Sequence, residues 1–268
     1  MSDTPWLTVI GLGEDGPEGL PPASRDALAR AEVEMGPPRH LWLLPDLKAE
    51  TIEWPVPFAD GVPVLEGVRG RRVVVLASGD PFWVGAGTVL AEKFAASEWQ
   101  ALPGPSVFSL AAARLGWPLE QTLCLGLHAQ PLTRLRPHLA PGIRAIVLLR
   151  DGDAVAELAR YLVAQNFGES EMHVLEALGG PRENITNLRA DTLANAGFHA
   201  PVAVALVVAG AGTALPKASG VDDAVFDHDG QITKRPVRAL AMSALAPKPG
   251  EMLWDIGGGS GSIAIEWL

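Results

Sequence analysis

The feature that most constrains the fold of this chain is the stretch VVVLASGDPFWVGAGT at residues 73–88. Its first four residues form the β-branched apolar run that is typical of a strand buried on both faces. Gly79 then allows a close approach of the backbone to a ligand, and Pro81 ends the strand. An apolar helical run follows. A strand that ends in a glycine turn before a helix predicts an open α/β sheet, which binds small molecules beyond the carboxyl ends of its strands.

The side chain in this turn is Asp80. An aspartate there offers an acceptor to an amine, a hydroxyl or a cation. The plainer interpretation is an ordinary turn between a strand and a helix with a solvated aspartate, because Gly-Asp-Pro is a common sequence. The spacing alone leaves both interpretations open.

The rest of the chain continues the alternation of strands and helices, which predicts an α/β fold. Strands are predicted at residues 6–10, 33–35, 51–54, 99–102, 119–123, 145–149, 172–177, 201–209 and 252–256, and helices at 23–31, 88–94, 131–139, 153–165 and 237–246. The continuous apolar run at 201–209 should lie in the centre of its sheet.

The first predicted strand ends in GLGEDG at residues 11–16, which is formally the G-x-G-x-x-G fingerprint of dinucleotide-binding proteins. In that fingerprint the last glycine lies inside the following helix. Here Pro17, Pro21 and Pro22 intervene, so that a helix can begin only near Pro22. We therefore expect a longer, open glycine loop, with a dinucleotide oxidoreductase as an alternative.

Composition excludes several classes of protein. The chain has 268 residues, enough for two domains, and its net charge of −10 argues against a general nucleic-acid binder. A single cysteine, Cys124, excludes an intrachain disulfide and a cysteine-based zinc site, and we predict no metal. The N-terminal sequence has no basic region before its apolar run, and no apolar run is long enough to span a bilayer. We expect a cytoplasmic protein that binds neither nucleic acid nor a membrane.

The central stretch resembles the Ser-Gly-Asp-Pro segment of the tetrapyrrole methylases, a family that binds S-adenosylmethionine between two α/β domains. The glycine loop at 11–16, the segment PGPS at 103–106 before an alanine-rich helix, and EALGGPRE at 176–183 resemble the same family. On spacing alone, Ser106 would be read as the cap of a core helix. The resemblance implies cofactor contacts at Ser78, Gly79, Asp80, Pro81, Trp83, Ser106, Val107, Leu149, Leu178 and Ala203, and a substrate-side loop at Gly11, Gly13 and Glu14.

A second motif lies near the C-terminus, where DIGGGSG at 255–261 fits Asp-x-Gly-x-Gly-x-Gly. It resembles the first cofactor motif of the class I methyltransferases, at Asp255, Gly257, Gly259 and Gly261. The resemblances together imply a substrate-side lobe at 1–126, a cofactor-side lobe at 127–212, a linker at 213–232, and a truncated, Rossmann-like start of a class I domain at 233–268.

This combination resembles the fused methylases of cobalamin synthesis, and it implies transfer of a methyl group from S-adenosylmethionine to C5 of a precorrin. C15 methylation and decarboxylation would belong to a second half, and we expect a homo-oligomer. No nucleophilic side chain is needed, because the protein mainly has to align donor and acceptor. The candidate bases are Glu14, Asp15 and Asp80, and the candidate clamps for substrate carboxylates are Arg39, Arg114 and Arg134.

Two other functions remain open at this point. The first half could belong to another tetrapyrrole methylase, such as a uroporphyrinogen or another precorrin C-methyltransferase, or to a relative that modifies a protein or an RNA. The chain could also be a non-catalytic module that binds the cofactor and docks to a separate second half.

Overall fold

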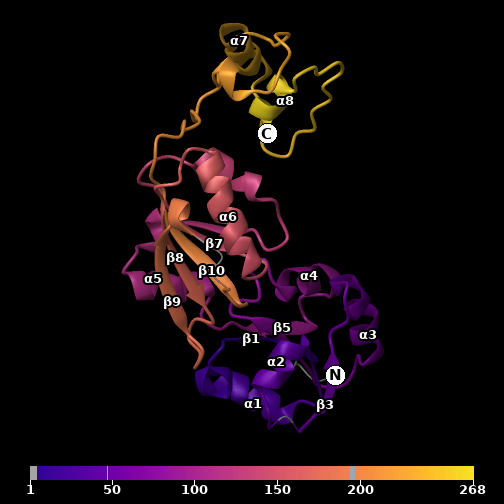
Figure 1. The fold of residues 1–268 in the computed structure, drawn as a ribbon. Helices are drawn as coiled ribbons and strands as arrows, with labels where there is room; N and C mark the ends of the chain where they lie inside the picture. The colour runs from indigo at the N-terminus through magenta and orange to yellow at the C-terminus, as the bar shows by residue number, and fades with distance from the viewer. Residues whose placement is uncertain (1–4, 47, 194–196) are drawn as a thin grey trace. The chain divides into compact units, whose positions relative to one another are not determined.

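The computed structural model describes residues 5–46, 48–193 and 197–268, and the chain divides into two compact units. The larger unit comprises Met1–Arg134 and Pro141–Ala211, and the smaller unit comprises Leu135–Ala140 and Gly212–Leu268. The larger unit holds two five-stranded sheets (Figure 1). We call the first sheet with its helices the first lobe (residues 5–105) and the second sheet with its helices the second lobe (residues 106–134 and 141–211).

The elements alternate along the chain as the sequence predicts. The first lobe contains β1 (Leu7–Leu12), α1 (Pro22–Arg30), β2 (Val33–Gly36), α2 (Pro38–Leu43), β3 (Glu50–Glu53), α3 (Gly61–Gly67), β4 (Val73–Ser78), α4 (Ala86–Lys93) and β5 (Trp99–Leu102). The second lobe contains α5 (Val107–Leu115), β6 (Leu123–Gly126), β7 (Arg144–Leu148), α6 (Asp153–Ala164), β8 (Glu171–Glu176), β9 (Asn184–Arg189) and β10 (Val202–Val207). Short 3₁₀ helices occupy Gly16–Gly19, Phe58–Asp60, Leu119–Gln121, Leu132–His138, Ala190–Thr192 and Asp223–Val225.

The first sheet is parallel throughout, in the order β3-β2-β4-β1-β5. The odd-numbered residues of β4 pack with residues of α3 and α4 on one face, and its even-numbered residues pack with residues of α1 and α2 on the other. Burial on both faces explains why this strand is continuously apolar rather than alternating. The chain therefore has the α/β architecture that the sequence predicts.

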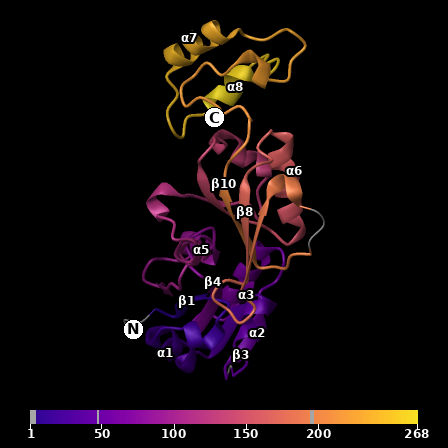
Figure 2. The ribbon, with the colours of Figure 1, turned by 60° about the vertical axis from the view of Figure 1, so that its left-hand side comes forward.

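The second sheet is mixed, in the order β6-β7-β10-β8-β9. β10 lies in its centre and pairs antiparallel with β7 and β8, which confirms the central position predicted for residues 201–209. Helices α5 and α6 lie on opposite sides of this sheet (Figures 1 and 2). Edge strand β9 was not predicted, because its residues are mostly exposed and carry no alternating apolar pattern.

Three predicted elements differ from the structure, and two of them lie between residues 119 and 139. The helix predicted at 131–139 is a 3₁₀ helix at Leu132–His138, which contains Pro137, a residue with no backbone N–H for an α-helical hydrogen bond. The strand predicted at 119–123 is replaced by a 3₁₀ turn and by β6, which begins at Leu123. Because β6 pairs with β7, the boundary predicted at residue 126 falls at the end of a strand of the second sheet.

The smaller unit contains α7 (Arg235–Leu245) and α8 (Ser262–Trp267), with a fully buried arginine at its centre. The Arg238 guanidinium donates to Glu266 (Nε to Oε1, 2.5 Å), to Asp223 (Nη1 to Oδ1, 3.0 Å) and to the carbonyls of Val221 and Thr233. The predicted strand at 252–256 is not formed, and within the described part of this unit no strand is present to pair with it. A strand needs a neighbour for its backbone groups.

Three glycines meet where the strands of the first sheet reach their carboxyl ends. The Gly79 N–H donates to the carbonyl of Leu12 (2.9 Å), and the Gly104 N–H donates to the carbonyl of Gly79 (3.0 Å). A Cβ added to Gly11 would lie 1.7 Å from the Gly79 oxygen and 2.4 Å from the Gly104 nitrogen. Gly79 has a φ of +50°, which side chains disfavour. The end of β1 and the turns after β4 and β5 are therefore in direct backbone contact.

Among the described residues, no helix is long and apolar enough to cross a membrane.

The glycine contact predicts a large effect of a small substitution. Gly11→Ala should lower the free energy of unfolding by about 3 kcal/mol, because the added methyl group has to displace backbone atoms. The matched control is Gly67→Ala in α3, where the new Cβ meets no atom within 4 Å and stability should be unchanged or raised by up to about 1 kcal/mol. Urea denaturation measures both variants, and equal stabilities would contradict the account of this contact.

A buried carboxyl gives a second prediction. Glu34 on β2 is 1% exposed, and among the described residues its Oε2 has no hydrogen-bond partner. Burial raises its pKa from 4.5 to about 7. Between these two pH values the folded chain keeps a proton that the unfolded chain has lost, so this group's contribution to stability falls as the pH rises.

Glu34→Gln should remove this loss, because the amide has the shape of the neutral carboxyl and does not ionise. At pH values above about 8 we expect the variant to be about 3 kcal/mol more stable than the wild type, since one pKa unit corresponds to about 1.4 kcal/mol. Below pH 5 the two should differ little. The measurement is the difference between their unfolding free energies as a function of pH, and a difference independent of pH would contradict the prediction.

Candidate active site

A cavity of about 750 Å³ opens in the larger unit, at the carboxyl ends of β1 and β4. Its wall comes from the turns of the first lobe, from α5 and from the ends of β7, β8 and β10 in the second lobe. The volume lies within the range of about 300–1,000 Å³ that is typical of small-molecule sites. The position is the one at which open α/β sheets bind ligands.

Most residues predicted from the sequence as ligand contacts do line this cavity. They are Gly13 and Glu14 of the first loop, and Ser78, Gly79, Asp80, Trp83, Ser106, Val107, Leu149, Leu178 and Ala203. Gly11 and Pro81 do not line it: Gly11 is covered by Gly79 and Gly104, and the Pro81 carbonyl accepts from Gly87 N–H (2.9 Å) and closes the turn. Asp255, Gly257, Gly259 and Gly261 belong to the smaller unit. The specific ligand roles of all these residues stay predictions.

One wall of the cavity is apolar and comes largely from the second lobe. Trp83 lies against Phe108 of α5, with their ring centroids 4.7 Å apart. Leu149, Leu178 and Ala203 continue this wall, each of them buried. Such a surface suits a flat aromatic group that has to leave water.

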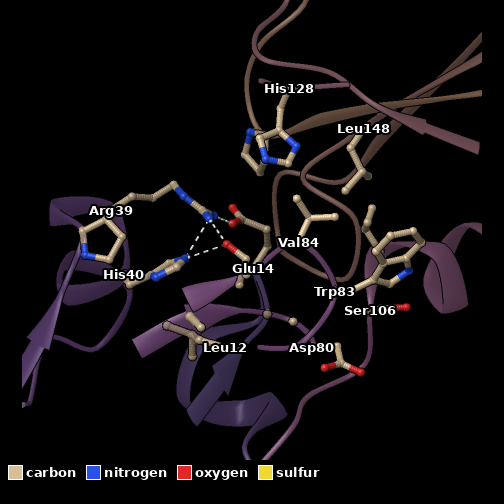
Figure 3. A pocket seen from close by; sticks show the side chains of 18 of the residues that line it. Leu12, Glu14, Arg39, His40, Asp80, Trp83, Val84, Ser106, His128 and Leu148 are labelled. Atoms are coloured by element: carbon tan, nitrogen blue, oxygen red, sulfur yellow. Dashed lines mark hydrogen bonds and ion pairs between the residues drawn. The ribbon is translucent and has the colours of Figure 1, made fainter. Parts of the chain in front are cut away.

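The turn between β4 and α4 holds two further features. Asp80 Oδ1 accepts from the Phe82 N–H (2.9 Å), which orients the carboxylate at the edge of the cavity. Val84 has a φ of +52°, which is a rare conformation for a β-branched residue and marks local strain. Val84 lines the cavity (Figure 3). Strained residues of this kind are often found at ligand-binding sites.

The opposite end of the cavity carries a polar cluster that comes from three elements of the first lobe (Figure 3). Arg39 of α2 donates to Glu14 Oε1 through Nη1. Its Nη2 lies 2.8 Å from His40 Nε2 and 3.0 Å from Ser78 Oγ. His40 Nε2 is also 3.0 Å from Ser78 Oγ. The four side chains form one connected network.

The donors and acceptors of this network define the state of His40. Arginine can only donate, so the contact with Arg39 makes His40 Nε2 an acceptor. The Ser78 hydroxyl accepts from Arg39 and lies within hydrogen-bond distance of His40 Nε2. Burial and the charge of Arg39 lower the pKa of His40 to about 4, which keeps the ring neutral near pH 7.

Glu14 also connects the two lobes. Its Oε2 accepts from Arg182 Nη2 of the second lobe (3.1 Å), while its Oε1 accepts from Arg39. Both carboxylate oxygens of Glu14 are therefore occupied by guanidinium groups, and Glu14 is not our candidate for the base. The predicted base Asp15 does not line the cavity. Asp80 is the one predicted base that lines it without a cationic partner among the described residues.

Of the three arginines predicted to bind substrate carboxylates, only one lines the cavity. Arg39 lines the cavity. Arg114 does not, because both of its donating nitrogens bind Glu183 (2.6 and 2.8 Å). Arg134 is not among the lining residues.

His40 and Arg182 were not predicted from the sequence. A signal for His40 was present, since Pro37 and Pro38 begin a helix directly after β2 and so place His40 at the carboxyl edge of the sheet. Nothing local marks Arg182, which reaches Glu14 only through the packing of the two lobes.

Comparison with known proteins places this geometry in a family. The model of the tetrapyrrole (corrin/porphyrin) methylases matches residues 7–194, and the model of a precorrin methyltransferase domain matches residues 224–268. A precorrin-6Y C(5,15)-methyltransferase (decarboxylating) from a Sinorhizobium species is 50% identical over 268 residues, which are 99% of this chain and 65% of that protein. The chain thus spans about two thirds of the length of this relative.

A shorter relative is the cobalt-precorrin-7 C(5)-methyltransferase of Salmonella typhimurium, 29% identical over 182 residues that cover 67% of this chain and 88% of that protein. Among solved structures, the precorrin-6Y methylase of Archaeoglobus fulgidus has a TM-score of 0.58 at 24% identity and covers 77% of this chain and 98% of its own.

A uroporphyrin-III C-methyltransferase of Thermus thermophilus, solved in complex with S-adenosyl homocysteine, has a TM-score of 0.58 at 20% identity and covers 75% of this chain and 96% of its own. At these identities the solved structures establish a shared fold. The sequence matches also establish the family, because the family model covers most of the chain. The matched residues include the first sheet, the turn at Ser78–Pro81, and strands β6, β7, β8 and β9 of the second sheet. The chain belongs to the tetrapyrrole (corrin/porphyrin) methylase family.

Proposed function

We propose that this chain transfers a methyl group from S-adenosylmethionine to C5 of a precorrin macrocycle in cobalamin synthesis. The observation that carries the proposal is the 50% identity, over 99% of the chain, to a precorrin-6Y C(5,15)-methyltransferase. The match to a C(5)-methyltransferase over 182 residues supports assigning the C5 reaction to the larger unit. We attribute C15 methylation and decarboxylation to the precorrin methyltransferase domain whose model matches residues 224–268.

The residues of the cavity fit the cofactor. The apolar wall at Phe108, Leu178 and Ala203 suits an adenine ring, and the Asp80 carboxylate suits a cationic amino group. Gly79 allows the backbone to approach a ligand, since its φ is +50° and it carries no side chain. The related uroporphyrin-III C-methyltransferase was solved with S-adenosyl homocysteine, the product of this cofactor. We therefore assign cofactor binding to Asp80, Trp83, Ser106, Val107, Leu178 and Ala203.

For this methyl transfer, the main task of the protein is to align the methyl donor with the acceptor carbon. When bound, S-adenosylmethionine supplies a methyl group on a positively charged sulfur, which is a good electrophile. The turn at Ser78–Pro81 and α5 would hold the donor side, and the first loop would face the acceptor carbon. Alignment of two reactants can lower a barrier by about 7–11 kcal/mol. The apolar wall keeps water away from the reacting groups.

The proposal predicts which carbon of the macrocycle the chain methylates. Incubation with precorrin-6Y and S-adenosylmethionine, followed by mass spectrometry and NMR of the product, should show a methyl group added at C5. A product methylated at other carbons and not at C5 would contradict the proposal. Cofactor binding without any added methyl group would favour a non-catalytic module and overturn the proposal.

The same assay tests the turn after β4. Asp80→Asn should lower kcat/KM by about 100-fold, because misplacing one reactant costs this order of rate. It should also raise the KM for the cofactor. The control is Asp26→Asn on the exposed face of α1, which should leave both constants unchanged. If Asp80→Asn behaves as the control does, Asp80 does not bind the cofactor.

A further inference from the structure

The polar cluster at the first-lobe end of the cavity does not balance its charge. Arg39 and Arg182 both donate to Glu14, one to each carboxylate oxygen. Glu14 is 9% exposed, so this carboxylate is nearly removed from water. Among the described residues, two guanidinium groups share one carboxylate, which leaves one positive charge without an anionic partner.

The two guanidinium groups are held close to each other against their repulsion. Burial and the charge of Arg182 lower the pKa of Arg39. Gly180 lies against Glu14 so closely that a Cβ there would be 2.6 Å from both the Cβ and the carbonyl oxygen of Glu14. Glu183 fixes the same loop, since it accepts from Arg114 and from the Gly179 N–H (2.7 Å). The loop that carries Arg182 is therefore anchored on both sides.

Neighbouring groups do not compensate the extra charge. His40 is neutral, and the Ser78 hydroxyl has no charge. Arg150, another arginine of the cavity wall, is paired with Asp151 (2.7 Å) and lies near Glu157 (3.5 Å). Among the described residues, Glu14 is the one carboxylate that binds Arg39 or Arg182.

Donor groups also remain for a ligand. Of the three nitrogens of the Arg182 guanidinium, Nη2 alone donates within the described chain, and the side chain is 55% exposed. An arginine with a free edge binds a carboxylate through two parallel hydrogen bonds. Arg182 is not among the residues that line the cavity, but it binds Glu14, which lines the cavity together with Arg39. The geometry thus combines an uncompensated charge and free donors next to the cavity wall.

We propose that Arg39 and Arg182, positioned by Glu14, form an anion site that binds one carboxylate of the tetrapyrrole substrate. The identity of the ligand rests on the proposed function, whereas the charge imbalance does not. Arg182 thereby takes the place that the sequence analysis gave to Arg114 and Arg134. It also makes the substrate side of the site depend on both lobes.

The test compares two stable corrins that differ in charge at the same side chains. Cobyrinic acid carries free carboxylates, and cobinamide carries amides in their place. Binding of each to the full chain is followed by isothermal titration calorimetry. Arg182→Gln should weaken the binding of cobyrinic acid by about 10- to 100-fold, since hydrogen bonds between charged groups are the strong ones. The affinity for cobinamide should change by less than about threefold.

The control variant is Arg189→Gln, an exposed arginine of the second lobe that pairs with Asp191 (2.6 Å) and does not line the cavity. It should leave both affinities unchanged. Equal losses for both corrins on Arg182→Gln would mean that Arg182 only joins the lobes, and this would overturn the anion site. No loss for cobyrinic acid would overturn it as well.

Glu14 acts here as a positioning residue. Its role is tested separately, by the ratio of the affinities for cobyrinic acid and cobinamide. Glu14→Gln should reduce the preference for cobyrinic acid over cobinamide, because the charge that draws the two arginines together is gone. Glu14→Asp should restore part of this preference. A stronger preference in Glu14→Gln would mean that Glu14 competes with the ligand, and would overturn the positioning role.

Titration with S-adenosyl homocysteine separates this inference from the proposed function. The cofactor product should bind wild type and Arg182→Gln equally. If it binds while wild type does not distinguish the two corrins, the anion site fails and the methyltransferase proposal stands. If wild type binds neither S-adenosyl homocysteine nor a corrin, both fail.

Discussion

The larger unit depends on a backbone contact at the carboxyl ends of its first sheet. The end of β1 touches the turns after β4 and β5 through Gly11, Gly79 and Gly104, at distances that exclude a side chain at Gly11. This contact brings the substrate-side loop and the Ser78–Pro81 turn to one place. The cavity lies where it does because three parallel strands end together there, and α/β sheets in general bind ligands at that edge.

The two lobes contribute different chemistry to the cavity. The second lobe supplies a buried apolar wall through α5, β7, β8 and β10, and the first lobe supplies the polar cluster around Glu14. The apolar wall suits a methyl donor that carries an aromatic ring, and the polar cluster suits an acceptor that carries carboxylates. The Glu14–Arg182 pair joins the halves, so the polar end of the cavity is complete only when both lobes are in place.

Much of this arrangement was predictable from the sequence, because hydrophobic runs and glycine turns are local signals. The run at residues 73–76 and the apolar run at 201–209 each identified a central strand. The features that were missed depend on tertiary contacts. Strand β9 is exposed and needs β8 to define it, and Arg182 meets Glu14 across 168 residues of chain. The strand predicted at 252–256 is not formed, because an apolar run in the sequence does not ensure that a neighbouring strand is present to pair with it.

The central claim is that the cofactor binds in this cavity, beside the turn after β4. The chain carries a second glycine-rich segment at 257–261, so two places compete for the same ligand. A crystal structure of the full chain with S-adenosyl homocysteine decides between them. The account predicts the ligand between Asp80 and the apolar wall at Leu178 and Ala203. A ligand bound elsewhere, with the turn at Ser78–Pro81 covered by the protein's own side chains, would contradict it.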